Sequence, residues 1–275
     1  MSAQSAPARS YLFVPGDRPE RFDKALASGA DRVVLDLEDA VAPAAKAQAR
    51  DRVANCLQTL SVEERQRVVV RINDESTAWF DADLAMLGSV RVAEVMLPKA
   101  EHPETIQLLR SNCAGITVLP LLESARGVLN AEALAAQPGV HRLVFGTIDY
   151  ALDLDLSGDP VGLDFAASRL ALASRAAGIA SPVAGVTPEI SDDDRLRADL
   201  ARSRAHGFGA KLCIHPRQVA VLHAALLPSG AELEWARRVV AATEGNPAAV
   251  QVDGRMVDRP VLQRAHAVLA RAAIH

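Results

Sequence analysis

Short apolar runs rich in Val, Leu and Ile recur along the chain and alternate with longer segments of helical spacing. Near-continuous apolar runs are typical of strands covered on both faces, as in a parallel sheet wrapped by helices. Eight runs are predicted to be strands: 11–14, 32–37, 67–72, 93–97, 116–122, 142–145, 181–184 and 211–214. The seventh has the weakest pattern, because proline and alanine dilute it.

The segments between the predicted strands carry helix-start signals. Four of them begin at a proline, which suits a first turn because its missing N–H costs nothing there: Pro19, Pro43, Pro103 and Pro216. Ser191 and the aspartates at 192–194 are typical of a helix cap followed by acids in the first turn. The same acids could hold a metal, but capping is the simpler interpretation and the one we adopt.

Eight strands alternating with helices predict an α/β protein, a (β/α)8 TIM barrel with a C-terminal helical extension. A doubly wound open sheet is the alternative, although segment 14–18 has one glycine and therefore lacks a Gly-rich dinucleotide loop. About 60 residues follow the last strand, more than the single helix that a minimal barrel requires. We expect a flexible tail at 1–9, the catalytic barrel at 10–227, and an extension at 228–275 that contributes to a neighbouring subunit.

Composition adds mainly exclusions. The 275 residues carry a formal net charge of −4, with Lys and Arg spread among Asp and Glu, which argues against a nucleic-acid-binding face. No apolar run approaches the roughly 18 residues of a membrane helix, and the N-terminus does not read as a secretory signal. Cys56, Cys113 and Cys213 are far apart and form no CxxC, which predicts reduced thiols in a cytoplasmic protein.

Polar residues stand at the end of almost every predicted strand. Active sites of (β/α)8 barrels are built at the C-terminal ends of the strands, so these residues are candidates for a site. In chain order they are Asp17, Arg18, Asp36, Glu38, Asp39, Arg71, Asn73, Lys99, Glu123, Asp149 and His215. Solvated residues would also end strands in a structural protein, but their repetition over six or seven strands favours a functional site.

Glu123 and Asp149 follow adjacent predicted strands. Two carboxylates with several waters are how Mg²⁺ is usually held, whereas the scarcity of histidine makes Zn²⁺ less attractive. Glu123 could equally be an ordinary acid at a helix start, and spacing alone does not separate the two interpretations. His215 could be a base, but a packed residue before Pro216 is the interpretation we favour.

Arg71 ends the third predicted strand, where its guanidinium could clamp a substrate carboxylate through two parallel hydrogen bonds. The alternative is a salt bridge to Glu38 or Asp39 on the neighbouring strand. Both can hold, because an acid behind Arg71 would fix the orientation of its side chain.

Eight motifs in order resemble those of the citrate lyase β-subunit-like proteins of the HpcH/HpaI aldolase superfamily, from about Ser10 to the last helix. Each motif is weak alone, but eight in order at the right spacing are specific. They are LFVPGDRPE at 12–20, DLEDAV at 36–41, RIN at 71–73, LPK at 97–99, LESARG at 122–127, FGTIDY at 145–150, IHP at 214–216 and MVDRP at 256–260. One departure is GFGAK at 207–211, where family members commonly have a second glycine before the lysine.

The resemblance implies a TIM barrel assembled as a trimer or hexamer, with Glu123 and Asp149 as Mg²⁺ ligands. It implies that Arg71 binds the substrate carboxylate, and that Arg18 and Lys24 contact an acyl-CoA or its phosphates. It further implies that Asp258 enters the active site of the adjacent protomer. From the residues alone, Asp258 is more simply an acid at a helix start beside Pro260.

The function implied is a Mg²⁺-dependent carbon–carbon lyase that cleaves a 3-hydroxy-acyl thioester of the citramalyl-CoA, malyl-CoA or citryl type. The products would be an acetyl thioester and a 2-oxo acid, with Asp258 moving a proton at the enolate carbon. One alternative is a metal-dependent aldolase of free hydroxy-keto acids, which needs no CoA contact. Another is a β subunit that acts only with an acyl carrier protein in a citrate lyase complex.

Overall fold

The structure, a computed structural model, describes residues 7–243 and 250–272. The described residues form two compact units, the larger from Pro7 to Leu222 and the smaller from the residues that follow it. Most of the tail predicted at 1–9, and residues 244–249 and 273–275 of the extension, lie outside the described residues.

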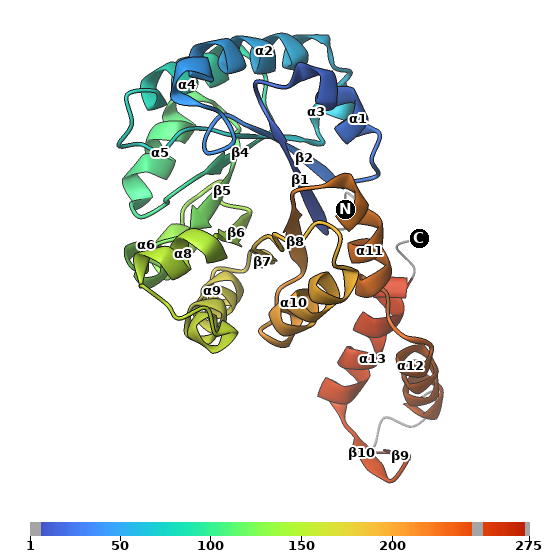
Figure 1. The fold of residues 1–275 in the computed structure, drawn as a ribbon. Helices are drawn as coiled ribbons and strands as arrows, with labels where there is room; N and C mark the ends of the chain where they lie inside the picture. The colour runs from blue at the N-terminus through green and yellow to red at the C-terminus, as the bar shows by residue number, and fades with distance from the viewer. Residues whose placement is uncertain (1–6, 244–249, 273–275) are drawn as a thin grey trace. The chain divides into compact units, whose positions relative to one another are not determined.

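The larger unit is a closed barrel of eight parallel strands, in which each strand pairs with the next along the chain (Figure 1). Pairing of the first strand with the eighth closes the sheet and excludes the doubly wound alternative. Every predicted strand is present, with its ends displaced by at most one residue. The strands are β1 Ser10–Pro15, β2 Arg32–Asp36, β3 Val68–Arg71, β4 Glu94–Leu97, β5 Thr117–Leu122, β6 Arg142–Phe145, β7 Ala180–Ala184 and β8 Ala210–Cys213.

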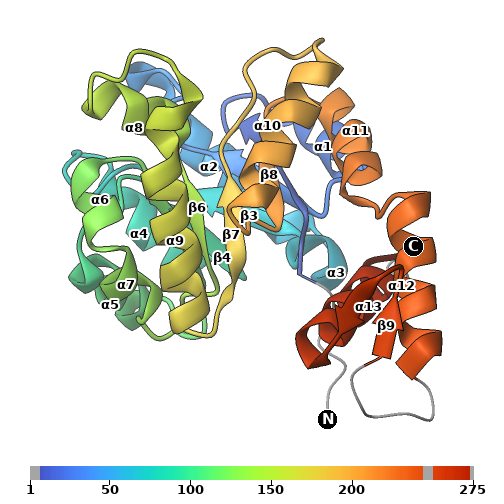
Figure 2. The same ribbon diagram turned by 90° about the horizontal axis from the view of Figure 1, so that it is seen from below.

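Helices surround the barrel; α9, for example, packs against β6 and β7 on its outer side (Figure 2). The four prolines open helical turns as predicted, two of them as 3-10 turns. The helical elements of this part of the chain are η1 Pro19–Arg21, α1 Phe22–Leu26, η2 Pro43–Ala45, α2 Lys46–Thr59, α3 Val62–Arg65, α4 Phe80–Ser89, α5 Pro103–Asn112, α6 Ala125–Leu129, α7 Ala131–Ala135, α8 Thr147–Asp153, η3 Pro160–Leu163, α9 Asp164–Ala176, α10 Asp193–Ala205 and α11 Pro216–Leu226.

Inward-pointing side chains from the strands fill the barrel, among them Tyr11, Val34, Met96, Val144 and Leu212. This packed interior leaves no room for a pore and confines ligand binding to the ends of the strands. At the N-terminal end, the buried guanidinium of Arg142 donates hydrogen bonds to the carbonyls of Ala8 and Ser181. That end is tied together by structural contacts, and the candidate residues gather at the other.

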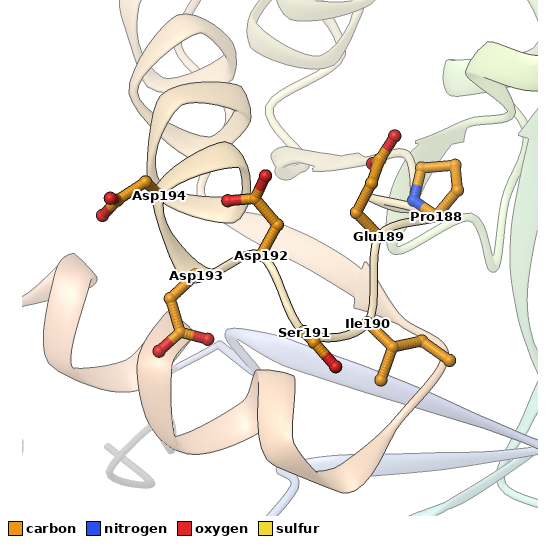
Figure 3. Close-up of a pocket in the computed structure, with 7 residues that line it drawn as sticks. All are labelled: Pro188, Glu189, Ile190, Ser191, Asp192, Asp193 and Asp194. Carbon is orange, nitrogen blue, oxygen red and sulfur yellow. The ribbon is translucent and has the colours of Figure 1, made fainter.

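The acidic segment before α10 is a helix start. Oδ1 of Asp192 accepts a hydrogen bond from the N–H of Arg195 at 2.9 Å, so Asp192 rather than Ser191 is the cap. The side chains of Asp192, Asp193 and Asp194 point in different directions (Figure 3). Within the described ranges, no group of three or more His, Cys, Asp or Glu is placed to hold a metal, which supports capping.

The smaller unit pairs α12, Gly230–Thr243, with α13, Arg259–Ala272, around a core that includes Val239 and Val268. Between them in the chain lies a hairpin of β9, Val250–Val252, and β10, Arg255–Val257. Asp253 and Gly254 form its turn with φ angles of +52° and +76°, which suit a two-residue hairpin loop. These two helices confirm that the extension predicted after the barrel is helical.

Two further sequence expectations concern thiols and membranes. All three cysteines are free, and Cys113 and Cys213 are buried. No helix in the described part of the chain is long and apolar enough to cross a membrane.

Candidate active site

A cavity of about 420 Å³ lies at the C-terminal ends of the barrel strands. Its walls bring together candidates that are far apart in the sequence, from the ends of four strands, β2, β3, β5 and β6. Its charged lining consists of Arg71, Glu123, Asp149, Asp36 and Asp39, with Phe13, Leu121, Gly146 and Gly185 among the uncharged residues. One guanidinium therefore faces four carboxylates, an excess of negative charge that favours a bound cation.

Arg71 is held by carboxylates of the neighbouring strand. Its Nε and Nη2 each donate to an oxygen of Asp36 at 2.7 Å, while Nη1 lies 2.8 Å from Glu38 and 3.7 Å from Asp39. Burial opposes the charged form, but the nearby carboxylates, Asp36 above all, outweigh it and hold the pKa of Arg71 above its ordinary value. The guanidinium of Arg71 is therefore charged, and its orientation is fixed by the acids behind it, as expected from the sequence.

Asp36 is the partner of Arg71 that sequence reasoning missed, since it assigned this role to Glu38 and Asp39 alone. The signal was the strand register: Asp36 and Arg71 are directly paired across β2 and β3. Asp36 also accepts backbone hydrogen bonds from Glu38 at 2.9 Å and Ala40 at 3.2 Å. These two hydrogen bonds orient the carboxylate of Asp36 independently of its contact with Arg71.

Arg71 retains donors for a ligand. A guanidinium has five N–H groups, and the hydrogen bonds to Asp36 use two of them, the Nε–H and one on Nη2. Nη1 forms an ion pair with Glu38, and N–H groups on Nη1 and Nη2 remain for a carboxylate. The ring of Phe13, centred 4.8 Å from the guanidinium carbon, supports the side chain from β1.

Glu123 follows β5 and is 4% exposed. Its Oε1 accepts the backbone N–H of Lys99 at 2.8 Å. Its side chain lies against Gly146, where an added Cβ would stand 2.6 Å from both Cβ and Oε2 of Glu123. The absence of a side chain at Gly146 therefore leaves the space that the side chain of Glu123 occupies.

The electrostatics of Glu123 favour the protonated acid in the absence of a cation. Burial, followed by repulsion from Glu38 and from Asp149, raises its pKa, while the N–H of Lys99 and the charge of Arg71 oppose the rise. The net effect raises the pKa of Glu123 to about 8. A positive charge near Oε2 would reverse this balance.

The donor set fits Mg²⁺. Glu123 and the half-buried Asp149, on the first turn of α8, line the same cavity. Mg²⁺ is usually bound through one or two carboxylates while waters and substrate complete its shell. In the part of the chain that the structure describes, no group of three or more His, Cys, Asp or Glu is placed to hold a metal ion, so a site of two carboxylates suits Mg²⁺ better than Zn²⁺.

Behind Arg71, Glu38 is 5% exposed, and burial is the main cause that raises its pKa to about 7. Asp39 and Asp36 add to the rise, whereas Arg71 and Lys99 oppose it. The Nζ of Lys99 lies 3.8 Å from Glu38 and 3.6 Å from Asp74. Sequence reasoning placed Lys99 at a strand end but gave it no role.

Three other candidates stand apart from the cavity lining. Arg18 and Lys24 are exposed side chains at η1 and α1. His215 serves the start of α11, because its Nδ1 accepts the N–H of Arg217 at 3.2 Å. This local contact agrees with the structural interpretation of His215 rather than with a base.

Asp258 belongs to the smaller unit and is exposed. Its Oδ1 accepts the N–H of Val261 at 3.1 Å, and its carbonyl accepts the N–H of Leu262 at 3.0 Å. Asp258 therefore caps α13, as the simpler interpretation expected. A cap also fixes the direction of the carboxylate, which is compatible with a second role.

Two family models match the chain. Residues 9–216 match HpcH/HpaI aldolase/citrate lyase, and residues 170–275 match a C–C bond lyase of the TIM-barrel fold. A (3S)-malyl-CoA thioesterase of Cereibacter sphaeroides is 34% identical over 99% of this chain and 97% of its own length. An L-malyl-CoA/β-methylmalyl-CoA lyase of that species is 30% identical over 97% and 95%.

Solved structures agree with these matches. A crystal structure of CitE from Mycobacterium tuberculosis, in complex with magnesium, acetoacetate and coenzyme A, superposes with a TM-score of 0.88. It is 37% identical in sequence and covers 98% of this chain and 100% of its own. The chain belongs to the HpcH/HpaI aldolase/citrate lyase family.

Proposed function

We propose that the protein is a Mg²⁺-dependent carbon–carbon lyase that cleaves a 3-hydroxy-acyl-CoA, of the malyl-CoA or citramalyl-CoA type, to acetyl-CoA and a 2-oxo acid. The observation that carries the proposal is the cavity in which a guanidinium with donors left on Nη1 and Nη2 faces the buried Glu123 and the half-buried Asp149. The lyase relative and the CitE complex with magnesium, acetoacetate and coenzyme A support it.

Arg71 binds the carboxylate at the hydroxy end of the substrate and sets the direction of the bond that breaks. Glu123 and Asp149 hold the metal, whose charge lowers the pKa of the substrate alcohol and stabilises the carbonyl that forms from it. When the hydroxyl proton passes to water, the C–O bond becomes a carbonyl, the bond between C2 and C3 breaks, and its electron pair is left on the thioester enolate.

Asp258, supplied by a second protomer of a trimer or hexamer, protonates the enolate carbon or removes the methyl proton in the condensing direction. An ordinary aspartate has a pKa of about 3.9, so the acid role requires either a raised pKa in the assembled site or proton delivery through another group. Arg18 and Lys24 contact the phosphates of CoA. Their exposure suits contact with a ligand that is itself mostly outside the cavity.

A panel of CoA thioesters tests the proposal. With Mg²⁺, malyl-CoA should yield glyoxylate, and citramalyl-CoA pyruvate, each in equal amount with acetyl-CoA. A second candidate is hydrolysis, favoured by the thioesterase relative. Hydrolysis would release free CoA and the intact hydroxy acid, so the product ratio separates the two activities in one assay.

Two further alternatives predict different partners. An aldolase of free hydroxy-keto acids would turn over substrates without a CoA group and show no affinity for free CoA. A citrate lyase β subunit would act on a thioester carried by an acyl carrier protein and leave every CoA ester untouched. Cleavage of a CoA ester by the isolated chain would argue against both.

A further inference from the structure

Lys99 has an unusual backbone conformation. Its φ of +44° lies in the left-handed region, which residues other than glycine, asparagine and aspartate seldom adopt. Asp155 and Asp253 are the other non-glycine residues in the described ranges with this conformation, and both are aspartates in exposed turns. Lysine at such a position needs another explanation, and strained residues of this kind cluster at functional sites.

The conformation of Lys99 serves Glu123. It directs the backbone N–H from the loop after β4 onto Oε1 of Glu123 at 2.8 Å. With Oε1 occupied and the side chain seated against Gly146, Oε2 is the oxygen left for a cation. The hydrogen bond thus chooses which oxygen faces a ligand.

Contacts from β5 and from the start of α6 hold the loop in this conformation. The N–H of Ala100 donates to the carbonyl of Leu121 at 3.0 Å, and Ser124 Oγ donates to Glu101 at 2.5 Å. Gly127 permits the approach, since a Cβ there would lie 2.7 Å from the Ala100 carbonyl. The LPK and LESARG motifs, at 97–99 and 122–127, therefore form one contact region, which we call the cradle of Glu123.

We propose that Lys99 is a positioning residue for the metal: its left-handed backbone, locked by the approach of Ala100 to Gly127, presents Glu123 to Mg²⁺. The inference rests on the proposed function, which assigns Glu123 as a Mg²⁺ ligand. It gives the decisive part to the backbone of Lys99 rather than to its half-exposed ammonium, which lies near Glu38 and Asp74.

Three substitutions of Lys99 in the full-length protein separate backbone from side chain. Lys99→Gly keeps the N–H and accepts a positive φ, and Lys99→Met removes only the charge. Lys99→Val places a β-branched residue where a positive φ is most strained. Calorimetric titration with MgCl₂ should show wild-type affinity, within about threefold, for the first two, and a loss of about tenfold or more for the third, the range seen when a support of a metal ligand is removed.

Gly127→Ala perturbs the same cradle from α6 and should weaken Mg²⁺ binding to a similar extent, even if Lys99→Val does not fold. Asp155→Val is the matched control, because it strains the same backbone conformation in an exposed turn. It should lower the melting temperature without changing Mg²⁺ affinity. That contrast distinguishes positioning from a general loss of stability.

The inference is overturned if Lys99→Val and Gly127→Ala bind Mg²⁺ as the wild type does. It is also overturned if Lys99→Met loses as much affinity as Lys99→Val, which would give the role to the ammonium. Glu123→Ala, titrated in the same series, separates this failure from that of the proposed function. If Glu123→Ala binds Mg²⁺ as the wild type does, Glu123 is not a metal ligand. If Glu123→Ala loses Mg²⁺ binding while Lys99→Val binds normally, only the role of Lys99 is refuted.

Discussion

Binding of Mg²⁺ to this protein should release a proton and strengthen as the pH rises. The reason lies in Glu123, whose pKa burial and neighbouring carboxylates raise to about 8 in the metal-free fold. A metal ligand must be ionised, so the cation competes with the proton for Oε2. Mg²⁺ affinity should therefore increase with pH. Below pH 8 the proton on Glu123 weakens Mg²⁺ binding, and above pH 8 Glu123 is mostly ionised and the proton no longer competes.

The size of the effect follows from the same pKa. With a pKa of about 8, Glu123 is roughly one-tenth ionised at pH 7 and nine-tenths at pH 9, so the apparent affinity should rise about tenfold over this range. At pH 7, each Mg²⁺ bound should release about 0.9 proton by the same arithmetic. Because Glu38 contributes to the raised pKa, the two carboxyls titrate as a pair, and Glu38→Gln should flatten the dependence.

Calorimetry in two buffers that differ in ionisation enthalpy, such as HEPES and Tris at pH 7, measures the proton release directly. Glu123→Gln is the control, since it keeps the shape of the side chain but has no proton to lose. Equal apparent heats in the two buffers, together with a dissociation constant that does not change between pH 7 and 9, would refute the reasoning. Glu123 would then be ionised without the metal, and the electrostatic description of the cavity would be wrong.

Three substitutions test the other parts of the site. Arg71→Lys keeps a positive charge but loses the parallel donors, so kcat/KM should fall by about 100-fold; a fall below threefold in steady-state assays would show that charge alone suffices. Gly146→Ala pushes a methyl group into Glu123 and should weaken Mg²⁺ binding by calorimetry, whereas unaltered affinity would mean that the carboxylate moves freely. Asp258→Asn retains a good helix cap but cannot exchange a proton, so turnover should fall by about 100-fold at an unchanged melting temperature; full turnover would remove Asp258 from the chemistry.

The barrel was predictable because its signals are local. A strand buried on both faces needs an apolar run, and a proline or a capping acid marks the helix start that follows it. Each predicted strand end consequently lies within one residue of the observed end. Closure of the sheet was less certain, because no sequence pattern encodes the pairing of β1 with β8.

The candidate site was predictable as a set of residues, but not as a set of contacts. Asp36, Glu38 and Asp39 are all within reach of Arg71, and only the pairing of β2 with β3 selects Asp36 for the two-pronged contact. The conformation of Lys99 gave no sequence signal at all, since lysine has no preference for positive φ. It depends on contacts made by α6, which lies one strand further along the barrel.

The charge distribution explains why the site needs both an arginine and a cation. Asp36 and Glu38 already offset the charge of Arg71, so the guanidinium offers directed hydrogen bonds but little net attraction. Asp149, together with the ionised fraction of Glu123, adds negative charge to the same cavity, which opposes the entry of an anionic substrate. In the proposed function, attraction therefore comes from a divalent cation, while Arg71 sets the orientation of the carboxylate that the cation draws in. Because Arg71 contributes directed hydrogen bonds rather than net charge, Arg71→Lys is expected to lower kcat/KM although it conserves the positive charge.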